Sequence, residues 1–368
     1  MISSTSFLEA LKRLDLTFFT GVPDSGLREF LVYLETHEDE TRHVRAVNEG
    51  QAVGIAVGYH LATGKVPVVY LQNSGLGNAM NPLTSLADLE VYGIPMILFV
   101  AWRGRPGEKD EPQHKKMGRV MEDMFKVLEI PYEVAKDEPE GLTAQAARLK
   151  EIALEHQAPV ALVFPRGIIE KEKQEEEQRE GLRREEALEI LLEKIGEAPV
   201  VSTTGYTSRE VFEIREKNEQ SHERDFLTVG SMGHASAIAL GIARSVSKRV
   251  FLIDGDGAFQ MHMGSAAAIG FYAPNLVHIV IDNGAHESTG GQPTLVSKLD
   301  WEKLFQSVGY KSVALVSGRE ELELLNLAAL SSPAALVVKV AQGTRTDLGR
   351  PTAAPQENKE AFMRFLQG

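Results

Sequence analysis

Apolar residues recur along the chain in short runs that alternate with stretches of helix-like spacing. A short apolar run bounded by turn residues is typical of a buried strand, and apolar positions three or four apart are typical of a helix. In the first half, the pattern predicts strands at 17–20, 42–46, 66–71, 94–100, 132–134 and 159–163, and helices that include 49–62, 76–88 and 141–155. In the second half, it predicts strands at 199–202, 226–229, 249–254, 276–282, 311–315 and 335–340, with helices between them. This alternation predicts an α/β protein in which each half is a doubly wound, mostly parallel sheet with helices on both faces.

A nearly continuous charged stretch separates the two halves. Residues 170–186 read EKEKQEEEQREGLRREE and offer no apolar face to a core. We interpret this stretch as a solvated linker that can be partly helical. The predicted domains are therefore 1–169 and 187–368, and the second includes a C-terminal tail. Their similar size and rhythm point to an old duplication, although no clear sequence repeat is present.

Composition narrows the class of protein. A hydrophobic content of 43% in 368 residues is enough for two sizeable cores, and the net charge of −13 argues against a nucleic-acid groove, which needs basic residues. With no Cys, the chain has no disulfide and no thiolate nucleophile. The N-terminus lacks the basic and apolar regions of a signal peptide, and no apolar run reaches the ~18 residues of a membrane span. These features fit a soluble enzyme, and we expect it to be cytoplasmic.

The most specific polar signals follow two neighbouring predicted strands. The first strand runs into Asp254-Gly-Asp-Gly257, and the next runs into Asn283-Gly-Ala285, so that Asp256 and Asn283 stand 27 positions apart. That spacing leaves room for one crossover helix, and ligands of open α/β sheets bind outside the carboxyl ends of the strands. Carboxylate and amide oxygens suit Mg²⁺, and Gly-rich backbone N–H groups suit phosphate oxygens. The sequence therefore predicts a magnesium-diphosphate site.

This arrangement resembles the signature of thiamine-diphosphate enzymes, in which an Asn follows Gly-Asp-Gly after a similar interval. The resemblance implies that 1–169 is a pyrimidine-binding domain and 187–368 a diphosphate-binding domain of the thiamine-diphosphate-binding fold. Related 2-oxoacid decarboxylases carry a middle domain, which this chain lacks. The implied cofactors are thiamine diphosphate and Mg²⁺, with the metal held by Asp256, Asn283 and the backbone carbonyl of Ala285.

Glu49 opens a predicted helix rich in Gly and Ala, directly after a predicted strand. Taken alone, Glu49 is an acid in the first turn of a helix, where the helix dipole favours it. The resemblance implies a catalytic role instead, because thiamine enzymes place a Glu here against the aminopyrimidine ring of the cofactor. A carboxylate in an apolar seam has a raised proton affinity and can share a proton with that ring.

Other segments match the cofactor site by resemblance. Met232 looks like the large apolar residue beneath the bent cofactor, with core packing as the alternative, and the carbonyl of Gly230 would accept from the cofactor's amine. The full set of expected cofactor-binding residues is Glu49, Asn73, Thr204, Gly205, Gly230, Ser231, Met232, Gly255, Asp256, Gly257, Ala258, Asn283, Ala285 and His286.

Loops after the predicted strands of the first half carry candidate catalytic and substrate-binding groups. Asp24, in Gly-Val-Pro-Asp-Ser, looks like a catalytic acid of 2-oxoacid decarboxylases, although Pro-Asp is also common in turns. The stretch 102–116 has few apolar residues, so we expect a loop, and its Arg103, Arg105, Lys109 and His114 would grip an anionic substrate, with His114 also catalytic. The alternative is a solvated charged loop, since acidic residues dilute this charge.

Four motifs narrow the resemblance to the phosphonopyruvate decarboxylase family. They are Trp-Arg-Gly-Arg-Pro-Gly (102–107), Asp-Glu-Pro-Gln-His (110–114), His-Glu-Ser-Thr-Gly-Gly-Gln (286–292) and Asp-Leu-Gly-Arg-Pro (347–351). The implied activity is decarboxylation of 3-phosphonopyruvate to phosphonoacetaldehyde and CO2 in phosphonate biosynthesis, by a carboxy-lyase. Sulfopyruvate decarboxylation and a thiamine-dependent carboligase reaction stay open as alternatives. The family pattern also implies a homodimer or homotetramer with active sites shared between chains, and neither nucleic acid nor membrane as a partner.

Overall fold

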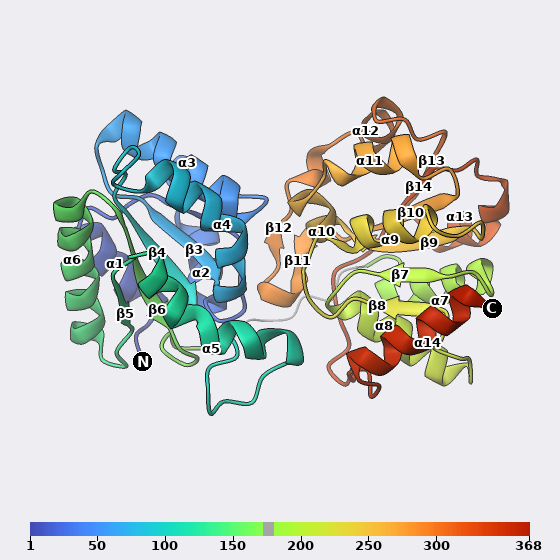
Figure 1. Cartoon of the computed structure of the whole chain (residues 1–368), viewed down its shortest axis with the longest axis horizontal. Helices are drawn as coiled ribbons and strands as arrows, with labels where there is room; N and C mark the ends of the chain where they lie inside the picture. Colours follow the sequence, from blue (N-terminus) through green and yellow to red (C-terminus); the bar gives the residue numbers. More distant parts are fainter. Residues whose placement is uncertain (172–179) are drawn as a thin grey trace. The chain divides into compact units, whose positions relative to one another are not determined.

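The computed structural model describes residues 1–171 and 180–368 of the chain. The chain divides into two compact units, Met1–Glu175 with Thr289–Gln292, and Glu176–Ser288 with Pro293–Gly368 (Figure 1). Among the described residues, no helix is both long and apolar enough to cross a membrane.

The N-terminal unit is a six-stranded parallel sheet with the order β2-β1-β3-β4-β6-β5. Its strands are β1 (Phe19–Gly21), β2 (His43–Arg45), β3 (Val68–Gln72), β4 (Met96–Ala101), β5 (Tyr132–Val134) and β6 (Pro159–Phe164). Its helices are α1 (Ser4–Arg13), α2 (Arg28–His37), α3 (Glu49–Thr63), α4 (Leu76–Pro82), α5 (Pro112–Val127) and α6 (Pro139–His156), with a π-helical turn at Leu83–Ala87 and a 3₁₀ turn at Asn73–Gly75.

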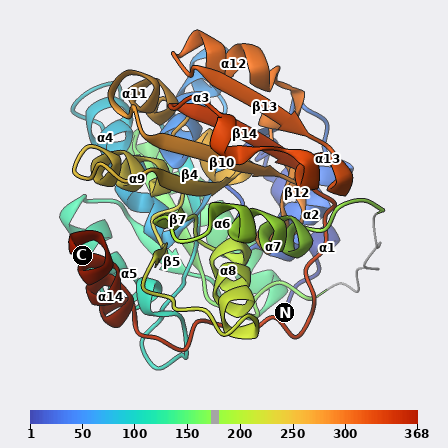
Figure 2. The same ribbon diagram turned by 90° about the vertical axis from the view of Figure 1, so that its right-hand side faces the viewer.

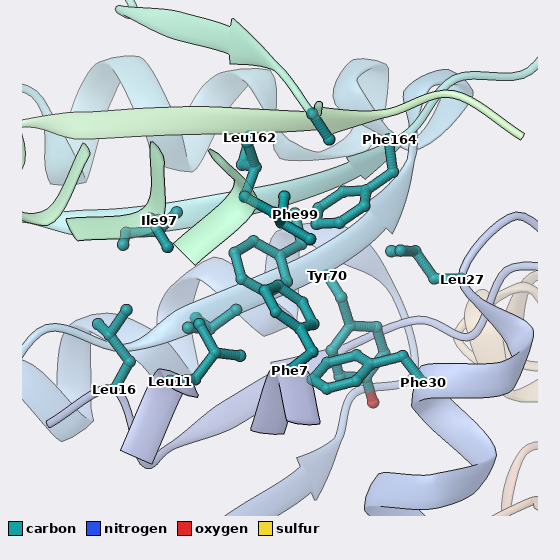
Figure 3. Close-up of a cluster of buried hydrophobic side chains, with 14 of the residues drawn as sticks. Phe7, Leu11, Leu16, Leu27, Phe30, Tyr70, Ile97, Phe99, Leu162 and Phe164 are labelled. Carbon is teal, nitrogen blue, oxygen red and sulfur yellow. The ribbon is translucent and has the colours of Figure 1, made fainter. Parts of the chain in front are cut away.

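Alternating side chains of the central strands separate the core of this unit into two layers. Along β4, Ile97 and Phe99 belong to one cluster, whereas Leu98 and Val100 belong to the other, as the period of two in a strand requires. In the first layer the rings of Phe7 and Phe99 lie 5.7 Å apart (Figure 3). A sheet that is apolar on both faces needs helices on both, which fixes the unit as doubly wound.

The C-terminal unit repeats this design with a second six-stranded parallel sheet, ordered β8-β7-β9-β10-β14-β13. Its strands are β7 (Val200–Ser202), β8 (Asp225–Leu227), β9 (Val250–Gly255), β10 (Leu276–Asp282), β13 (Ser312–Val316) and β14 (Ala334–Lys339), and a short ribbon pairs β11 (Ala285–His286) with β12 (Gln292–Pro293). Its helices are α7 (Arg184–Ile195), α8 (Tyr206–Lys217), α9 (Ala235–Ala243), α10 (Asp256–Met261), α11 (Ser265–Tyr272), α12 (Trp301–Ser307), α13 (Arg319–Leu324) and α14 (Pro355–Gln367), with 3₁₀ turns at Glu287–Thr289, Val296–Lys298 and Leu327–Ala329. Helices α7, α8 and α13 contribute to the core layer on one face, and α9, α11 and α12 to that on the other (Figure 2).

The two sheets share one topology. When each sheet's strands are numbered in chain order, both sheets read 2-1-3-4-6-5. In each, the chain reverses its direction of winding between the first and third strands, which are β1 and β3 in one unit and β7 and β9 in the other. Crevices at such switch points are where doubly wound sheets bind ligands. The topology therefore predicts two equivalent crevices, one in each unit.

The predicted fold class and all twelve predicted strands are confirmed, with end points that differ by at most two residues. The predicted helix 76–88 divides at Pro82 into α4 and the π-helical turn. Helix α7 begins at Arg184, inside the stretch 170–186 that the sequence assigns to a linker, and residues 172–179 of that stretch lie outside the described residues.

The prediction that 102–116 is entirely a loop is wrong after Glu111, because α5 begins at Pro112. A proline suits the first helical position, where its missing N–H leaves no hydrogen bond unmade. Farther along, Met121 and Phe125 are buried on one helix face at a spacing of four. This apolar face, beyond the charged segment, stabilises the helix and draws His114 into its first turn.

Candidate active site

Candidate polar groups of the N-terminal unit collect at the carboxyl edge of its sheet. Asp24 follows β1, Gln72 and Asn73 lie at the end of β3, and Arg103 follows β4. Because all these strands are parallel, their carboxyl ends meet along one edge. The switch point between β1 and β3 therefore lies among these polar groups.

Glu49 is the first residue of α3 and is 6% exposed. The helix starts here because the side chain of Asn48 caps it, accepting from the N–H of Gln51 at 2.9 Å. Burial raises the pKa of Glu49, and a 2.8 Å hydrogen bond from Asn78 Nδ2 opposes that rise in part. A carboxyl group with raised proton affinity is suited to sharing a proton with a neighbouring base.

Gly75 makes room for that carboxylate. A Cβ atom on Gly75 would lie 2.5 Å from Glu49 Oε1, which is closer than real Cβ contacts come. The 3₁₀ turn at Asn73–Gly75 and the helix α4 that follows it therefore form one wall around Glu49. No residue other than glycine fits at position 75 without moving the carboxylate.

Asp24 is 2% exposed and is held by two neighbours. Its Oδ1 accepts the N–H of Gly26 at 2.7 Å, and its Oδ2 accepts from Gln72 Nε2. The hydrogen bonds join the loop after β1 to the end of β3, so they span the switch point. The structure thus brings Asp24 into the crevice that the topology predicts.

Asn73 is fully buried, and its side-chain amide hydrogen-bonds to the backbone of the loop after β4. Its Nδ2 donates to the carbonyl of Arg103 at 2.8 Å, and its Oδ1 accepts the N–H of Arg103 at 3.2 Å. Both ends of the side-chain amide are therefore occupied. In this conformation Asn73 positions the loop, and its expected contact with the cofactor stays a prediction.

Arg103 is committed to an acidic partner, Asp110. Its guanidinium donates to both carboxylate oxygens, at 2.9 and 2.7 Å, and Nη1 donates to Ser25 Oγ at 2.8 Å. A second cation, Arg166, approaches Asp110 Oδ2 at 3.0 Å. Burial favours the neutral acid, but the hydrogen bonds from Arg103 and from the N–H groups of Glu111 and Gly104 outweigh it and hold the pKa of Asp110 well below its usual range. Asp110 is thus a fixed negative charge between two arginines.

The other three predicted substrate-binding groups differ from one another. Arg105 pairs with Glu108 at 3.5 Å and lies over the ring of Trp102, 5.2 Å from its centroid. Lys109 is exposed, and its ammonium has no hydrogen bond or ion pair with the described part of the chain. His114 is half-buried, and burial together with the charge of Arg103 lowers its pKa, so it is mainly neutral at pH 7.

The second crevice, in the C-terminal unit, is centred on Asp256, the first residue of α10. Asp256 is 3% exposed, and burial, aided by the charge of Asp282, raises its pKa to about 7. Its Oδ2 accepts from Thr294 Oγ1 at 2.7 Å, and the N–H of Thr294 donates to the carbonyl of Gly284 at 3.0 Å. Thr294 therefore connects Asp256 to the turn after β10, so the structure brings the two predicted metal-binding segments together.

Asn283 begins that turn and is half-buried. Its Oδ1 accepts the N–H of Ala285 at 3.0 Å, and its Nδ2 donates to Glu287 Oε2 at 3.3 Å. Gly284, between them, has a φ of +68°, a left-handed conformation that suits glycine. The turn is a compact unit in which the oxygen of Asn283 and the carbonyl of Ala285 come from residues two positions apart.

His286 and Met232 lie against the backbone of Gly257. A Cβ atom on Gly257 would be 2.9 Å from His286 Nδ1 and 3.5 Å from Met232 Cε. His286 Nε2 also lies 2.8 Å from Gln260 Nε2, one turn farther along α10. Met232 is half-buried, and its role beneath the cofactor stays a prediction.

The remaining predicted residues line the ends of β7, β8 and β9. Thr204 Oγ1 donates to the carbonyl of Val229 at 3.0 Å, which joins the first two of these ends. Gly205 and Ser231 adopt positive φ angles of +94° and +56°. The other predicted members at these ends are Gly230, Gly255 and Ala258, of which Ala258 is buried inside α10.

The C-terminal crevice has the chemical groups that a magnesium-diphosphate needs. Asp256 is a buried carboxylate whose ionisation a cation would favour. The buried hydroxyls of Thr203 and Thr228, at the ends of β7 and β8, have no hydrogen-bond partner in the part of the chain that the structure describes. No group of three or more His, Asp or Glu side chains among the described residues could hold a metal, so the candidate set combines one carboxylate with amide and carbonyl oxygens. These residues fit the cofactor that the sequence predicts.

Several residues that shape both crevices are missed by the sequence pattern. They are Ser25, Gln72, Asn78 and Arg166 in the N-terminal unit, and Arg184, Gln260, Asp282, Glu287 and Thr294 in the C-terminal unit. Arg166 carries a usable signal, because it follows β6 and therefore stands at the functional edge. Thr294 carries none, since it lies in an irregular segment far along the chain from Asp256.

Comparison with known proteins agrees with this geometry. The chain matches the family model for the N-terminal thiamine pyrophosphate-binding domain of thiamine pyrophosphate enzymes over residues 1–125, and the model for the C-terminal one over residues 203–340. A phosphonopyruvate decarboxylase of Streptomyces hygroscopicus is 36% identical over 99% of this chain and 94% of its own length. A phosphonopyruvate decarboxylase of Streptomyces viridochromogenes is 35% identical over 100% and 95%, and a sulfopyruvate decarboxylase of Methanosarcina acetivorans 28% identical over 85% and 84%. With two thiamine pyrophosphate-binding domains and near full-length similarity above 30%, the chain belongs to the phosphonopyruvate decarboxylase family of thiamine-diphosphate enzymes.

Proposed function

We propose that this protein decarboxylates 3-phosphonopyruvate to phosphonoacetaldehyde and CO2, as a step of phosphonate biosynthesis. The observation that carries the proposal is the group of cations around Asp110, in the loop after β4. Arg103 and Arg166 both contact this carboxylate, and Lys109 stands beside it in the chain. A phosphonate carries close to two negative charges, and it needs such a cluster in a protein of net charge −13.

The sulfopyruvate alternative has less support. A sulfonate has one charge where a phosphonate has about two, so it needs fewer cations. The sulfopyruvate decarboxylase that spans most of the chain is 28% identical, against 36% and 35% for the two phosphonopyruvate decarboxylases. Both considerations favour phosphonopyruvate.

The residues of the N-terminal crevice have separate tasks in this proposal. When bound, thiamine diphosphate supplies the electron sink for loss of CO2. Glu49, whose pKa is raised by burial, would share a proton with the aminopyrimidine ring of a bound cofactor. Asp24, oriented by Gln72 and Gly26, provides the acid beside the substrate, and His114 assists it. The proton that replaces the lost carboxylate reaches the product through these groups.

In the C-terminal crevice, we propose that Asp256, Asn283 and the carbonyl of Ala285 hold Mg²⁺ against the diphosphate. Octahedral Mg²⁺ takes its other ligands from diphosphate oxygens and water. Thr204, Gly205, Gly230 and Ser231 would contact the phosphates or the amine of the cofactor, and Met232 would support its rings. Asp256→Ala is therefore expected to abolish cofactor retention while the fold stays intact.

We further propose that the protein acts as a homodimer or homotetramer in the cytoplasm. Large apolar side chains are exposed on the N-terminal unit, with Leu61 70%, Leu89 61% and Tyr92 69% exposed. Gly54 and Gly58 of α3 have no atom within 4 Å of an added Cβ, so a partner helix could pack closely there. Sedimentation of the purified protein tests the assembly, and recovery of the protein with membranes would contradict the location.

Turnover of phosphonopyruvate, sulfopyruvate and pyruvate, measured side by side with the same enzyme, tests the activity. We expect phosphonopyruvate to give the highest kcat/KM, and the free aldehyde to be the product without any acceptor. A preference for sulfopyruvate would replace the substrate, and a product joined to a second molecule would indicate a carboligase.

A further inference from the structure

Three hydrogen-bond donors from distant parts of the C-terminal unit converge on the carboxylate of Glu287. Its Oε2 accepts from Asn283 Nδ2 at 3.3 Å and pairs with Arg184 Nη1. Its Oε1 accepts the N–H of Gly343, which follows β14. Glu287 therefore connects the turn after β10 to α7 and to the C-terminal tail.

Arg184 is itself immobilised. It is 5% exposed, and its Nε and Nη2 donate to the two carboxylate oxygens of Glu210 at 2.7 and 2.9 Å. Its Nη2 also donates to Thr344 Oγ1 at 2.6 Å, and its guanidinium lies over the ring of Tyr206. A planar fork with this many partners has one orientation, so Glu287 is presented to Asn283 at a fixed place.

The hydrogen bonds also determine which way the amide of Asn283 points. Its nitrogen faces the carboxylate of Glu287, which only accepts, and its oxygen faces the N–H of Ala285, which only donates. A flipped amide would place like groups against each other at both ends. The backbone carbonyl of Asn283 is held as well, by Gln342 Nε2 at 3.1 Å.

We infer that Glu287 is a positioning residue, held by Arg184, that turns the oxygen of Asn283 toward the bound magnesium ion. The inference rests on the proposed role of Asn283 as a metal ligand. Partners of this kind, one step beyond the ligands, typically change metal affinity about 10- to 100-fold. This role gives a defined task to the Glu of the His-Glu-Ser-Thr segment after β10.

The variant Asn283→Asp is expected to bind magnesium more weakly, although it introduces a carboxylate. A carboxylate is ordinarily a better magnesium ligand than an amide. Here, however, its second oxygen would replace the nitrogen that faces Glu287, and two carboxylates would meet at about the 3.3 Å of the present hydrogen bond. We therefore expect Asn283→Asp to weaken magnesium binding in the natural background and to recover when Glu287 is changed to Gln.

The test measures magnesium-dependent binding of thiamine diphosphate by calorimetry, without any turnover. Glu287→Gln should lower the apparent Mg²⁺ affinity about 10- to 100-fold. Glu185→Gln is the matched control, because Glu185 is the neighbour of Arg184 in the chain but pairs with Arg345 at 3.2 Å and not with Asn283. It should keep the natural affinity. The double variant Asn283→Asp with Glu287→Gln should bind Mg²⁺ more tightly than Asn283→Asp alone.

Natural Mg²⁺ affinity in Glu287→Gln would overturn the inference, as would equal weakness of Asn283→Asp in both backgrounds. If Glu287→Gln does not fold, Asn283→Asp is compared with the natural protein, and Mg²⁺ binding by the Asp variant that is as tight or tighter would have the same meaning. Asp256→Ala is measured in parallel. Natural affinity in that variant would refute the proposed metal site itself, a result distinct from failure of the role of Glu287.

Discussion

Single residues in the N-terminal crevice work through confinement. Glu49 is shielded from water at the start of a helix, touches Asn78 and is closely approached by Gly75. A group confined in this way has a defined orientation and a raised proton affinity, which are the two properties that a proton-sharing carboxylate needs. Small changes around it should therefore affect chemistry more than stability.

Glu49→Gln should lower turnover by about 10²- to 10⁴-fold, because the amide can donate and accept hydrogen bonds but cannot carry the shared proton. Cofactor affinity should stay near that of the natural protein. Steady-state kinetics and calorimetric titration with thiamine diphosphate measure the two quantities. Glu9→Gln, on the exposed side of α1, serves as the control. Unchanged turnover in Glu49→Gln would refute the role.

Gly75→Ala should impair turnover although it adds a single methyl group. The new Cβ would stand 2.5 Å from Glu49 Oε1, so the carboxylate must move. Gly77→Ala, two residues farther along in α4, has no atom within 4 Å of the new Cβ and should be nearly silent. Equal turnover in the two variants would show that the position of Glu49 is not critical.

Substitutions of the cations near Asp110 should affect the turnover of phosphonopyruvate and of pyruvate to different extents. Lys109→Ala should reduce kcat/KM about 10- to 100-fold for phosphonopyruvate and little for pyruvate, since one charge-assisted hydrogen bond contributes about 1.5–3 kcal/mol. Arg103→Ala should impair both substrates, because it also leaves the buried carboxylate of Asp110 without its bidentate partner. Equal losses for both substrates in Lys109→Ala would assign Lys109 to the fold or to loop closure.

At the scale of elements, the sequence predicts the strands of the two sheets far better than the loops. Strands such as β10 are found because seven consecutive residues are buried, and such apolar runs are visible in the sequence. The start of α5 is missed because its first turn is charged and its apolar face begins later, at Met121. The ties from Thr294 to Asp256 and from Glu287 to Asn283 join segments whose closeness depends on tertiary structure, so no local pattern reveals them.

The pairing of β1, β2 and β3 should be sensitive to acid through His43. Burial and the charge of Arg45 lower the pKa of His43 to about 4, even though Glu35 lies 3.6 Å from its Nδ1. The folded state therefore binds this proton less readily than the unfolded state, whose His titrates near 6.5. The contribution of neutral His43 to the free energy of unfolding should be fully present above pH 6.5. It should be lost as the pH drops toward 4, which lowers the free energy of unfolding by up to about 3 kcal/mol.

Thermal unfolding at pH 7.5 and pH 5 measures this effect. His43→Gln keeps a polar partner for the hydroxyl of Tyr70, which lies 2.8 Å from His43 Nε2, but cannot titrate. The decrease in Tm between the two pH values should therefore be smaller in this variant. His156→Gln, at the exposed end of α6, should keep the full decrease. An unchanged decrease in His43→Gln would show that other groups cause the acid sensitivity.

At the scale of the whole molecule, we expect each shared site of the proposed homodimer to contain Glu49 of one subunit and Asp256 of its partner. Glu49→Gln and Asp256→Ala chains are each expected to be inactive. After subunit exchange, random assortment into twofold dimers should restore up to about a quarter of the sites. Activity that stays at zero after confirmed exchange would indicate that each chain supplies both groups to its own site.

The common strand order of the two sheets is what a duplication of one ancestral domain would leave. Two such frameworks offer the same kind of switch point twice, yet a cofactor with an aromatic head and a charged tail has no such symmetry. Under the proposed function, the difference between the two units therefore lies in their loops. One unit would carry the acids that manage protons and the other the oxygen ligands for a cation, while the shared framework specifies where each set stands.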